Sequence, residues 1–359
     1  MKILILQQEY LHISRIKMWN YWCNIGIYEM LRLIGVNVDL LYIPHFKALR
    51  NKIDFSEYEI IIINDIVHGI SGEGPIILLD EDDFNFLLQL KKHLCGISVE
   101  SLFSYKDSDE LYPFAQKRLD KLKHFLPFFS SLLLTHPGDI KPISEILKIP
   151  ALWLKPIAFS EFEQTSFSNN EHAVFNGSLY PERVKYLNNE VKHGLTMKQL
   201  IIKNEDSEYW IPIIIKLCNY LDSFTSDTFS MEMYQRTIVD FINEKRKLAE
   251  INLIKNISKY KHVIHLPAFF KGCHPRVIQA LQAGVTPFTP TLSGIEKFWY
   301  QDSVDCLYYE AEKSGDLAGK IQSISDVLRT EILVNGRERN RSLRSELSLG
   351  FELISFLGR

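Results

Sequence analysis

Short apolar runs alternate with amphipathic stretches along the first half of the chain. Six runs have the length and the β-branched or leucine-rich content of one strand each: KILILQ, VNVDLLYI, EIIIINDI, LCGISVES, SSLLLTH and ALWLKPI. Helical patterns separate them, near residues 19–34, 82–92, 111–125 and 140–147. Strands that are apolar at successive positions are buried on both faces, so this order predicts a parallel sheet in a doubly wound α/β domain over residues 1–158.

The second half repeats this alternation after a polar connector, SEFEQTSFSNNEH, which has no apolar period. Its strand-like runs are HAVFNGSLY, MKQLIIK, HVIHLPA, VTPFTP and CLYYE, and helices are expected from Pro181 and from Gly315. We predict a second Rossmann-like domain over residues 171–340 and a terminal amphipathic helix over residues 341–359. Two such domains that face each other form an interdomain cleft at the carboxyl ends of both sheets, where open α/β folds bind ligands.

Composition narrows the classes of function. The chain has 359 residues and a net charge of −3, so it lacks the basic balance of a dedicated nucleic-acid protein, and no nucleic-acid partner is expected. Its five cysteines are odd in number and form no C-x-x-C pair, which favours a reducing compartment and a cytoplasmic location. No run approaches the roughly 20 apolar residues that span a bilayer, so no transmembrane segment is expected.

One stretch, GCHPRVIQALQAG, has the pattern of an anion site at the start of a helix, where free backbone N–H groups can meet a phosphate. Gly272 permits close approach of a ligand, Pro275 suits the first turn, and Arg276 adds a cation suited to a diphosphate. Gln279 lies on the same helical face, where it can bond ribose hydroxyls. We expect Gly284 to end the helix in a left-handed conformation. The alternative is a buried helix with a solvated Arg276, because the motif alone is not specific.

No dinucleotide cofactor and no metal are expected. The fingerprint G-x-G-x-x-G follows none of the strand-like runs, which argues against NAD or FAD. His262, His265 and His274 have no cysteine or carboxylate partners at the spacing of a metal site. The small molecule bound is therefore expected to be a substrate.

Four stretches of the second half carry a resemblance to a known family: FNGSLYPERVKYL, GCHPRVIQALQAG between two strands, GIEKFWYQDSVDCLYYE and ILVNGRERNRSLRSELSL. Together they resemble the group-1 GT-B glycosyltransferases, and more closely the CgeB-like branch, which includes a spore-maturation protein. The resemblance covers residues 173–356, and the first half agrees in architecture only. It implies a GT-B fold and transfer of a sugar from a nucleotide-diphosphate sugar to an acceptor, with retention of anomeric configuration. Helix dipole and arginine would stabilise the leaving group without a metal.

The resemblance also implies roles for further residues. Gly177 and Arg183 would lie near the donor diphosphate, and backbone N–H groups at Gly294, with Glu296 nearby, would meet the sugar. Each residue has a structural alternative: Gly177 as a tight turn, Arg183 as a solvated first-turn residue, and a helix capped by Ser293 in place of a sugar site.

The chain departs from the family's pattern at Asp302–Asp305, where the branch often has a glycine followed by glutamate, and at two positions around the donor loop. Many retaining members have two glutamates eight residues apart around the donor loop, and Lys271 and Gln279 stand there in this chain. Glutamine can bond a ribose but cannot make the charge-assisted hydrogen bond of a carboxylate. A second function therefore stays open, that of a catalytically degenerate GT-B protein that binds a glycan or a partner. A sugar-nucleotide epimerase is a further alternative, although no acid–base constellation for it is evident.

The first domain is expected to bind the acceptor. Glu100 lies at the end of the fourth strand-like run and His136 at the end of the fifth, so both are expected at the sheet edge that faces the cleft. Either side chain could act as a catalytic group by bonding the transferred sugar or the acceptor hydroxyl. The alternatives are a helix-capping Glu100 and a structural His136. The acceptor stays open among glycan, lipid, peptide and natural product.

Overall fold

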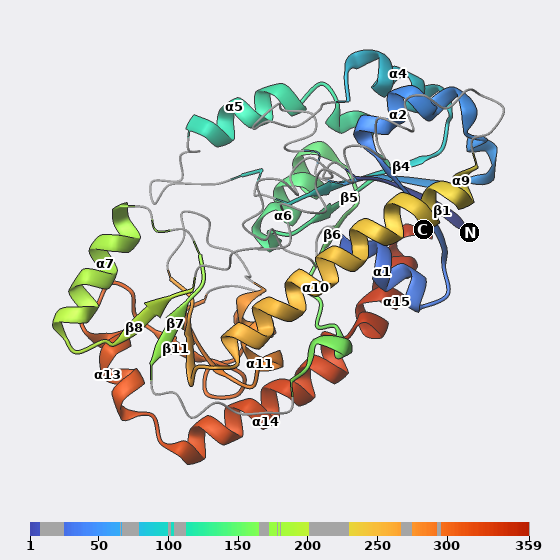
Figure 1. Cartoon of the computed structure of the whole chain (residues 1–359). Coiled ribbons are helices and arrows are strands. Elements are labelled where there is room, and N and C mark those ends of the chain that lie inside the picture. Colours follow the sequence, from blue (N-terminus) through green and yellow to red (C-terminus); the bar gives the residue numbers. More distant parts are fainter. Residues whose placement is uncertain are drawn as a thin grey trace. The chain divides into compact units, whose positions relative to one another are not determined.

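The computed structural model of the chain describes residues 1–7, 25–64, 66, 79–99, 102–103, 113–164, 172–177, 179, 181–200, 230–266, 275–292 and 296–358. The chain forms two compact units (Figure 1). Unit 1 comprises Met1–Lys155, Asn204–Lys247 and Gly350–Arg359, and unit 2 comprises Pro156–Lys203 and Leu248–Leu349.

Unit 1 is built on a six-stranded, all-parallel sheet in the order β2-β1-β3-β4-β5-β6. Its strands are β1 (Lys2–Gln7), β2 (Asn37–Tyr42), β3 (Ile60–Ile63), β4 (His93–Ser98), β5 (Ser131–Leu134) and β6 (Ala151–Trp153). Every residue of β3 and of β5 is buried. The predicted parallel sheet with strands covered on both faces is therefore confirmed.

Helices and short helical turns connect these strands. They are α1 (Ile25–Leu33), α2 (Ile43–Leu49), η3 (Arg50–Lys52), η4 (Phe55–Glu57), α4 (Glu81–Gln89), α5 (Pro113–Leu122), η5 (Leu126–Phe128), η6 (Pro137–Asp139), α6 (Ile140–Pro142) and η7 (Ile143–Leu147). Helix α4 begins at a capping box, in which the Asp80 carboxylate accepts from the Asp83 backbone N–H at 2.9 Å.

The edge strand β2 is covered by a later part of the chain, α9 (Met231–Tyr234) and η10 (Gln235–Val239). The Gln235 amide accepts from the Leu40 backbone N–H at 3.0 Å and donates to the Leu40 carbonyl at 2.7 Å. The Tyr234 hydroxyl accepts from the Tyr42 N–H at 3.2 Å. These bonds satisfy backbone groups that an edge strand would otherwise leave open.

Unit 2 is built on a five-stranded, all-parallel sheet in the order β11-β10-β9-β7-β8. Its strands are β7 (Ala173–Phe175), β8 (Met197–Gln199), β9 (His262–Ile264), β10 (Thr286–Pro290) and β11 (Leu307–Tyr309). Buried side chains of the strands meet buried side chains of the helices in one core, among them Phe175, Ile264, Phe288, Leu317 and Ile332.

The helices of unit 2 are η8 (Ser160–Phe162), α7 (Pro181–Lys192), α11 (Arg276–Gln282), α12 (Glu296–Trp299), α13 (Asp316–Ser323) and α14 (Asp326–Leu343). Two further helices, α10 (Asp240–Ile257) and α15 (Glu346–Leu357), each contribute residues to both units. The stretch predicted as one terminal helix is interrupted, because α14 ends at Leu343 and α15 begins at Glu346.

Helix α11 ends as the sequence predicts. Gly284 has a φ of 70°, in the left-handed region. The Val285 N–H donates to the Ala280 carbonyl at 2.9 Å and the Gly284 N–H to the Leu281 carbonyl at 3.1 Å. This pair of bonds is a Schellman motif, which turns the chain directly into β10.

Candidate functional site

The first candidate residues lie where β7 ends. A Cβ atom added at Gly177 would lie 2.8 Å from Cζ of Phe175 and 3.6 Å from Nη1 of Arg183. The Arg183 guanidinium carbon lies 5.6 Å from the centroid of the Phe175 ring. The missing side chain at position 177 thus allows backbone, aromatic ring and guanidinium to come together beside the first turn of α7.

The helix opening that the sequence predicts at Pro275 is present. Pro275 is the N-cap residue of α11, with a φ of −63°, and Arg276 is the first helical residue. The Gln279 N–H donates to the Pro275 carbonyl at 2.9 Å, which closes the first turn. Arg276 is half-buried, whereas Gln279 is buried. Gly272, the expected point of close backbone approach, lies outside the described residues.

Arg183 and Arg276 belong to different helices but lie within electrostatic range of each other. Burial, assisted by the charge of Arg183 and opposed by that of Glu250, lowers the pKa of Arg276 to about 10. Arg276 therefore stays protonated at neutral pH. Two guanidinium groups beside one sheet edge produce a positive field that suits a diphosphate.

His265 follows β9 and is part of the same cluster. Burial lowers its pKa to about 3, and the charges of Arg276 and Arg183 act in the same direction. Its Nδ1 lies 3.0 Å from the Thr289 hydroxyl, and its carbonyl accepts from the Tyr309 hydroxyl at 2.6 Å. A neutral His265 is thus held by residues of β10 and β11, and it adds no positive charge beside the arginines.

Glu250, on α10, is a member of the cluster that the sequence analysis missed. The Gln279 Nε2 donates to Glu250 Oε1 at 2.6 Å, and each side chain is 7% exposed. Burial raises the pKa of Glu250 to about 7, although the bond from Gln279 and the charge of Arg276 oppose the rise. One signal was available: Glu250 shares a helical face with the buried Leu253, Ile254 and Ile257, so a carboxylate stands at a core-facing position.

The second predicted helix entrance is only partly described. Glu296 is the first residue of α12 and is 6% exposed. Its backbone carbonyl accepts from the Tyr300 N–H at 2.9 Å, which closes the helical turn. Gly294 lies outside the described residues, so the role of this entrance in binding a sugar remains a prediction.

In unit 1, a buried carboxylate ties together the segments that follow β4 and β5. Asp139 Oδ2 accepts from the Leu102 N–H at 2.6 Å, and Oδ1 accepts from the Phe103 N–H at 3.1 Å. His136 is half-buried and lies at the N-cap of η6, just before Asp139. Glu100 lies outside the described residues, so the pairing of Glu100 with His136 in one site stays a prediction.

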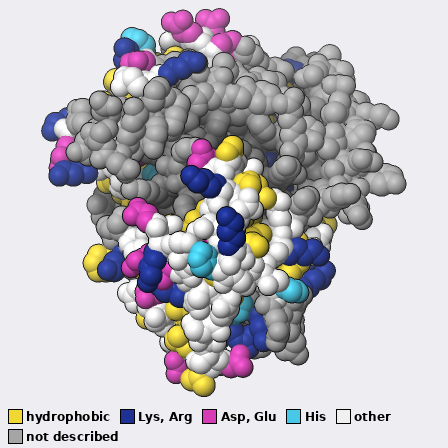
Figure 2. Space-filling view, turned by 90° about the vertical axis from the view of Figure 1, so that its left-hand side faces the viewer, with side chains coloured by type: hydrophobic (Ala, Val, Ile, Leu, Met, Phe, Trp, Pro, Cys, Tyr) yellow, Lys and Arg dark blue, Asp and Glu magenta, His cyan; other side chains and the backbone are white. Residues whose placement is uncertain are grey.

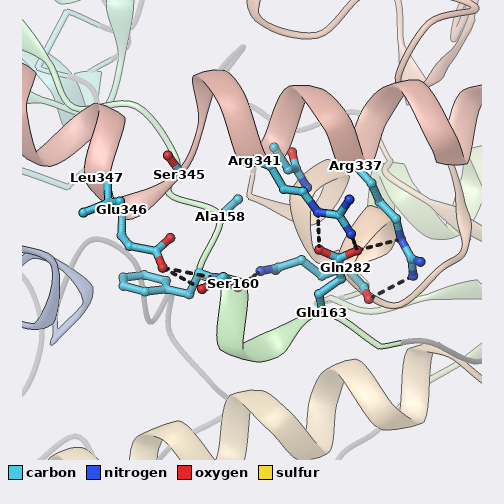
Figure 3. A pocket seen from close by; sticks show the side chains of 11 residues that line it. Ala158, Ser160, Glu163, Gln282, Arg337, Arg341, Ser345, Glu346 and Leu347 are labelled. Atoms are coloured by element: carbon cyan, nitrogen blue, oxygen red, sulfur yellow. Dashed lines mark hydrogen bonds and ion pairs between the residues drawn. The ribbon is translucent and has the colours of Figure 1, made fainter. Parts of the chain in front are cut away.

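A cavity of about 200 Å³ lies elsewhere in unit 2, between the segment 158–163 and residues of α14 and α15 (Figure 3). Glu163 accepts from Arg341 Nη2 at 2.6 Å and forms an ion pair with Arg337 Nε at 3.6 Å. The Ser160 hydroxyl donates to Glu346 Oε1 at 2.7 Å. None of the predicted site residues lines this cavity, and its charged side chains pair with one another, which indicates a structural role.

The described residues contain no cluster of three His, Cys, Asp or Glu side chains that could hold a metal ion. Among the described helices, none is long and apolar enough to cross a membrane. Figure 2 shows one face of the molecule, on which lysine and arginine side chains are interspersed with aspartate and glutamate.

Comparison with known proteins supports a fold but gives no relative at the level of sequence. No protein-family model and no curated protein matches the chain. HepE of Anabaena, solved in complex with UDP and glucose, is 11% identical with a TM-score of 0.55, and the match covers 100% of this chain and 99% of that one. Sucrose-phosphate synthase of Thermosynechococcus elongatus is 13% identical with a TM-score of 0.60, covering 99% and 97%.

A glycosyltransferase of Rickettsia africae matches in the same way, at 9% identity and a TM-score of 0.55, covering 99% of this chain and 97% of that one. Identities this low establish likeness of fold alone. The chain has the α/β fold of GT-B glycosyltransferases, with two parallel-sheet units, and the predicted fold class is confirmed.

Proposed function

We propose that the protein is a glycosyltransferase that moves a sugar from a nucleotide-diphosphate sugar to an acceptor. The observation that carries this proposal is the pair of guanidinium groups of Arg183 and Arg276 beside the sheet of unit 2, each close enough to influence its neighbours' ionisation. A diphosphate is the natural ligand of two arginines near the start of a helix in such a fold. Within the GT-B fold, the CgeB-like branch of the group-1 enzymes is the proposed affiliation.

The proposed donor site lies in residues 171–340. Arg183, Arg276 and the backbone at Gly177 and Gly272 would bind the diphosphate. They would stabilise the charge that develops on the leaving nucleotide, so that no metal and no cofactor is needed. Gln279, in the turn after Pro275, would hold the ribose. Transfer would retain the anomeric configuration, as the resemblance implies.

Two further groups complete the proposed donor and acceptor sites. Gly294 and Glu296 would meet the transferred sugar. Residues 1–158 would bind the acceptor, with Glu100 and His136 as the catalytic candidates. The acceptor is a glycan, lipid, peptide or natural product, and residues 341–359 would form a terminal helical element. A cytoplasmic location is proposed from the cysteine usage.

UDP-glucose is the first donor to test. HepE is described in complex with UDP-glucose, and separately with UDP and glucose. The fold likeness makes this donor a reasonable starting point for the present chain, alongside GDP, CMP and dTDP sugars.

A catalytically degenerate binding module is the second candidate function. One observation favours it: the Gln279 amide nitrogen is directed to the buried Glu250, in a position where related enzymes are expected to have a carboxylate. Such a protein would bind a nucleotide sugar or a glycan without transferring the sugar.

Thermal unfolding with each nucleotide sugar in turn tests the donor site. A ligand that binds the native state alone raises the melting temperature by mass action. We expect one nucleotide class to raise it, and Arg276→Ala to abolish that rise. Arg236→Ala is the matched control, because Arg236 is 76% exposed and pairs with Glu232 on the surface. A well-folded protein whose melting temperature no nucleotide sugar changes would contradict the proposal.

A further inference from the structure

The hydrogen bond between Gln279 and Glu250 joins two helices in the interior of unit 2. Its length is 2.6 Å from Nε2 to Oε1, which is short for an N–H···O bond and typical of one that a carboxylate accepts. Neither side chain is more than 7% exposed. A contact of this kind fixes both groups, because breaking it leaves a buried donor and a buried charge without partners.

The bond also determines how the Gln279 amide is oriented. An ionised carboxylate accepts hydrogen bonds and cannot donate, so the side of the Gln279 amide that faces Glu250 must be the NH₂ group. The carbonyl oxygen of Gln279 then faces away from Glu250. A protonated Glu250 has both a donor and an acceptor, so it would allow either orientation of the amide.

Among the described residues, two neighbouring side chains affect the ionisation of the Glu250 carboxyl. Gln279 and Arg276, both on α11, stabilise the carboxylate and oppose the effect of burial. Arg183 on α7 and His265 after β9 lie within electrostatic range of Arg276. When it is ionised, Glu250 therefore places a negative charge within electrostatic range of Arg276 and in contact with Gln279, which lies one helical turn along α11 from Arg276.

We propose that Glu250 is a positioning residue for ribose recognition. It orients and polarises the Gln279 amide, so that the carbonyl oxygen of Gln279 accepts a hydrogen bond from a ribose hydroxyl of the nucleotide. The carboxylate charge that Gln279 itself lacks is thus supplied from α10. This inference rests on the proposed donor site, and it makes Glu250 a determinant of the preference for ribonucleotides over deoxyribonucleotides.

The test measures the ratio of two dissociation constants, that of a deoxyribose form of the nucleotide divided by that of UDP. Dissociation constants of UDP and of its 2′-deoxy and 3′-deoxy counterparts are measured by calorimetry on the full-length protein at pH 8. Loss of one hydrogen bond to the ribose should weaken binding of one deoxy form by about 10-fold in the wild type. In Glu250→Gln the ratio should fall below about 3-fold, since two amides do not enforce one orientation.

The charge-swapped double variant Glu250→Gln with Gln279→Glu provides the rescue. The amide at 250 donates to the carboxylate at 279, whose other oxygen faces the ribose, so the preference should return to the wild-type ratio. Glu190→Gln is the matched control. Glu190 is a buried glutamate too, and its carboxylate accepts from the Gly315 and Ala318 N–H groups at 2.7 and 2.9 Å. This control should lower the melting temperature and leave the ratio unchanged.

The ratio should also depend on pH. The pKa of Glu250 is raised to about 7, so the carboxylate is ionised above that pH and protonated below it. At pH 5.5 the wild-type protein should therefore show the same low ratio of dissociation constants as Glu250→Gln. The ratio of that variant should not change with pH. Both nucleotides carry the same diphosphate, so titration of the phosphates cancels in the ratio.

The outcomes separate the two proposals. If none of the UDP, GDP, CMP and dTDP nucleotides binds the wild type, the donor site itself is wrong. If UDP binds and the ratio of Glu250→Gln stays at the wild-type value at pH 8, the donor site stands and the role of Glu250 is refuted. A ratio that falls in Glu250→Gln and returns in the double variant supports both.

Discussion

At the residue scale, Gly177 is a steric constraint in the described part of the candidate site. The Phe175 ring, which a Cβ at this position would meet, is 1% exposed and forms part of the core of unit 2. The ring cannot move aside without disturbing that core, because protein interiors are close-packed. The backbone at position 177 is consequently the surface that a ligand beside Arg183 would meet.

The variant Gly177→Ala tests this constraint. We expect it to lower the free energy of unfolding by about 1–3 kcal/mol, as overpacking commonly does, and to weaken nucleotide binding. Gly319→Ala is the control, because Gly319 is exposed within α13 and an added Cβ meets nothing within 4 Å. That change should stabilise the protein by about 0.5–1 kcal/mol through helix propensity. Chemical denaturation measures both, and equal effects of the two variants would contradict the steric account.

A helix entrance directly after a strand-like run singles out Arg276, because the carboxyl ends of parallel strands meet at one edge of a sheet. Arg183 came from the family resemblance, and the donor-binding roles of both arginines stay predictions. Glu250 was not found, since its partner Gln279 is 29 residues away on another helix and no local pattern links them. The orientation of the Gln279 amide is likewise a tertiary property.

At the element scale, the break between α14 and α15 is the feature that periodicity could not reveal. The stretch RNRSLRSELSLGFELISFL has neither proline nor an early glycine, so it is predicted as a continuous helix. Arg344 at the break is fully buried, and its guanidinium pairs with the equally buried Asp305. Its carbonyl accepts from the Ala158 N–H at 2.7 Å, so the chain is held in a non-helical turn.

The Asp305 carboxylate joins this break to the segment before β11. Besides Arg344, it accepts from Arg339 Nε at 2.8 Å and from the Gln301 N–H at 2.7 Å. The Arg344 guanidinium also lies over the rings of Trp299 and Tyr300, at 5.4 and 4.8 Å from their centroids. A buried cation with this many partners depends on its counter-ion.

We expect Asp305→Asn to lower the free energy of unfolding by about 3–5 kcal/mol, because it leaves the Arg344 charge buried without a counter-ion. Asp326→Asn is the matched control. Asp326 is 83% exposed and pairs with Arg329 at 3.2 Å, so its loss should cost less than about 1 kcal/mol. Hydrogen exchange of peptides from residues 326–349 locates the effect. Similar protection from hydrogen exchange in the two variants would show that Asp305 does not stabilise the turn between α14 and α15.

At the scale of the whole molecule, the two sheets could be predicted almost strand by strand. Among the described residues, each strand from β1 at Lys2–Gln7 to β11 at Leu307–Tyr309 coincides, to within one residue, with part of a run that the sequence singles out. Parallel order follows because such runs alternate with helices. The position of each strand depends on local composition, which can be read directly from the sequence.

The membership of the units depends on contacts that are distant in sequence. Residues 204–247 belong to unit 1, where Gln235 pairs with Leu40, and so do the last residues from Gly350. A Cβ at Gly350 would lie 3.3 Å from Cγ of Met30, so α15 and α1 approach each other closely. No periodicity in either segment indicates these partners.

Turnover of a nucleotide sugar is the direct test of glycosyl transfer by this protein. UDP-glucose, and then GDP, CMP and dTDP sugars, are incubated with the protein, with water or a cell-extract fraction as acceptor, and the released nucleotide is measured. We predict release from one donor class, and a rate at least about 100-fold lower in Arg276→Ala, which removes a cation from the leaving group. A donor that binds tightly and is never turned over would contradict a glycosyltransferase and favour the binding module.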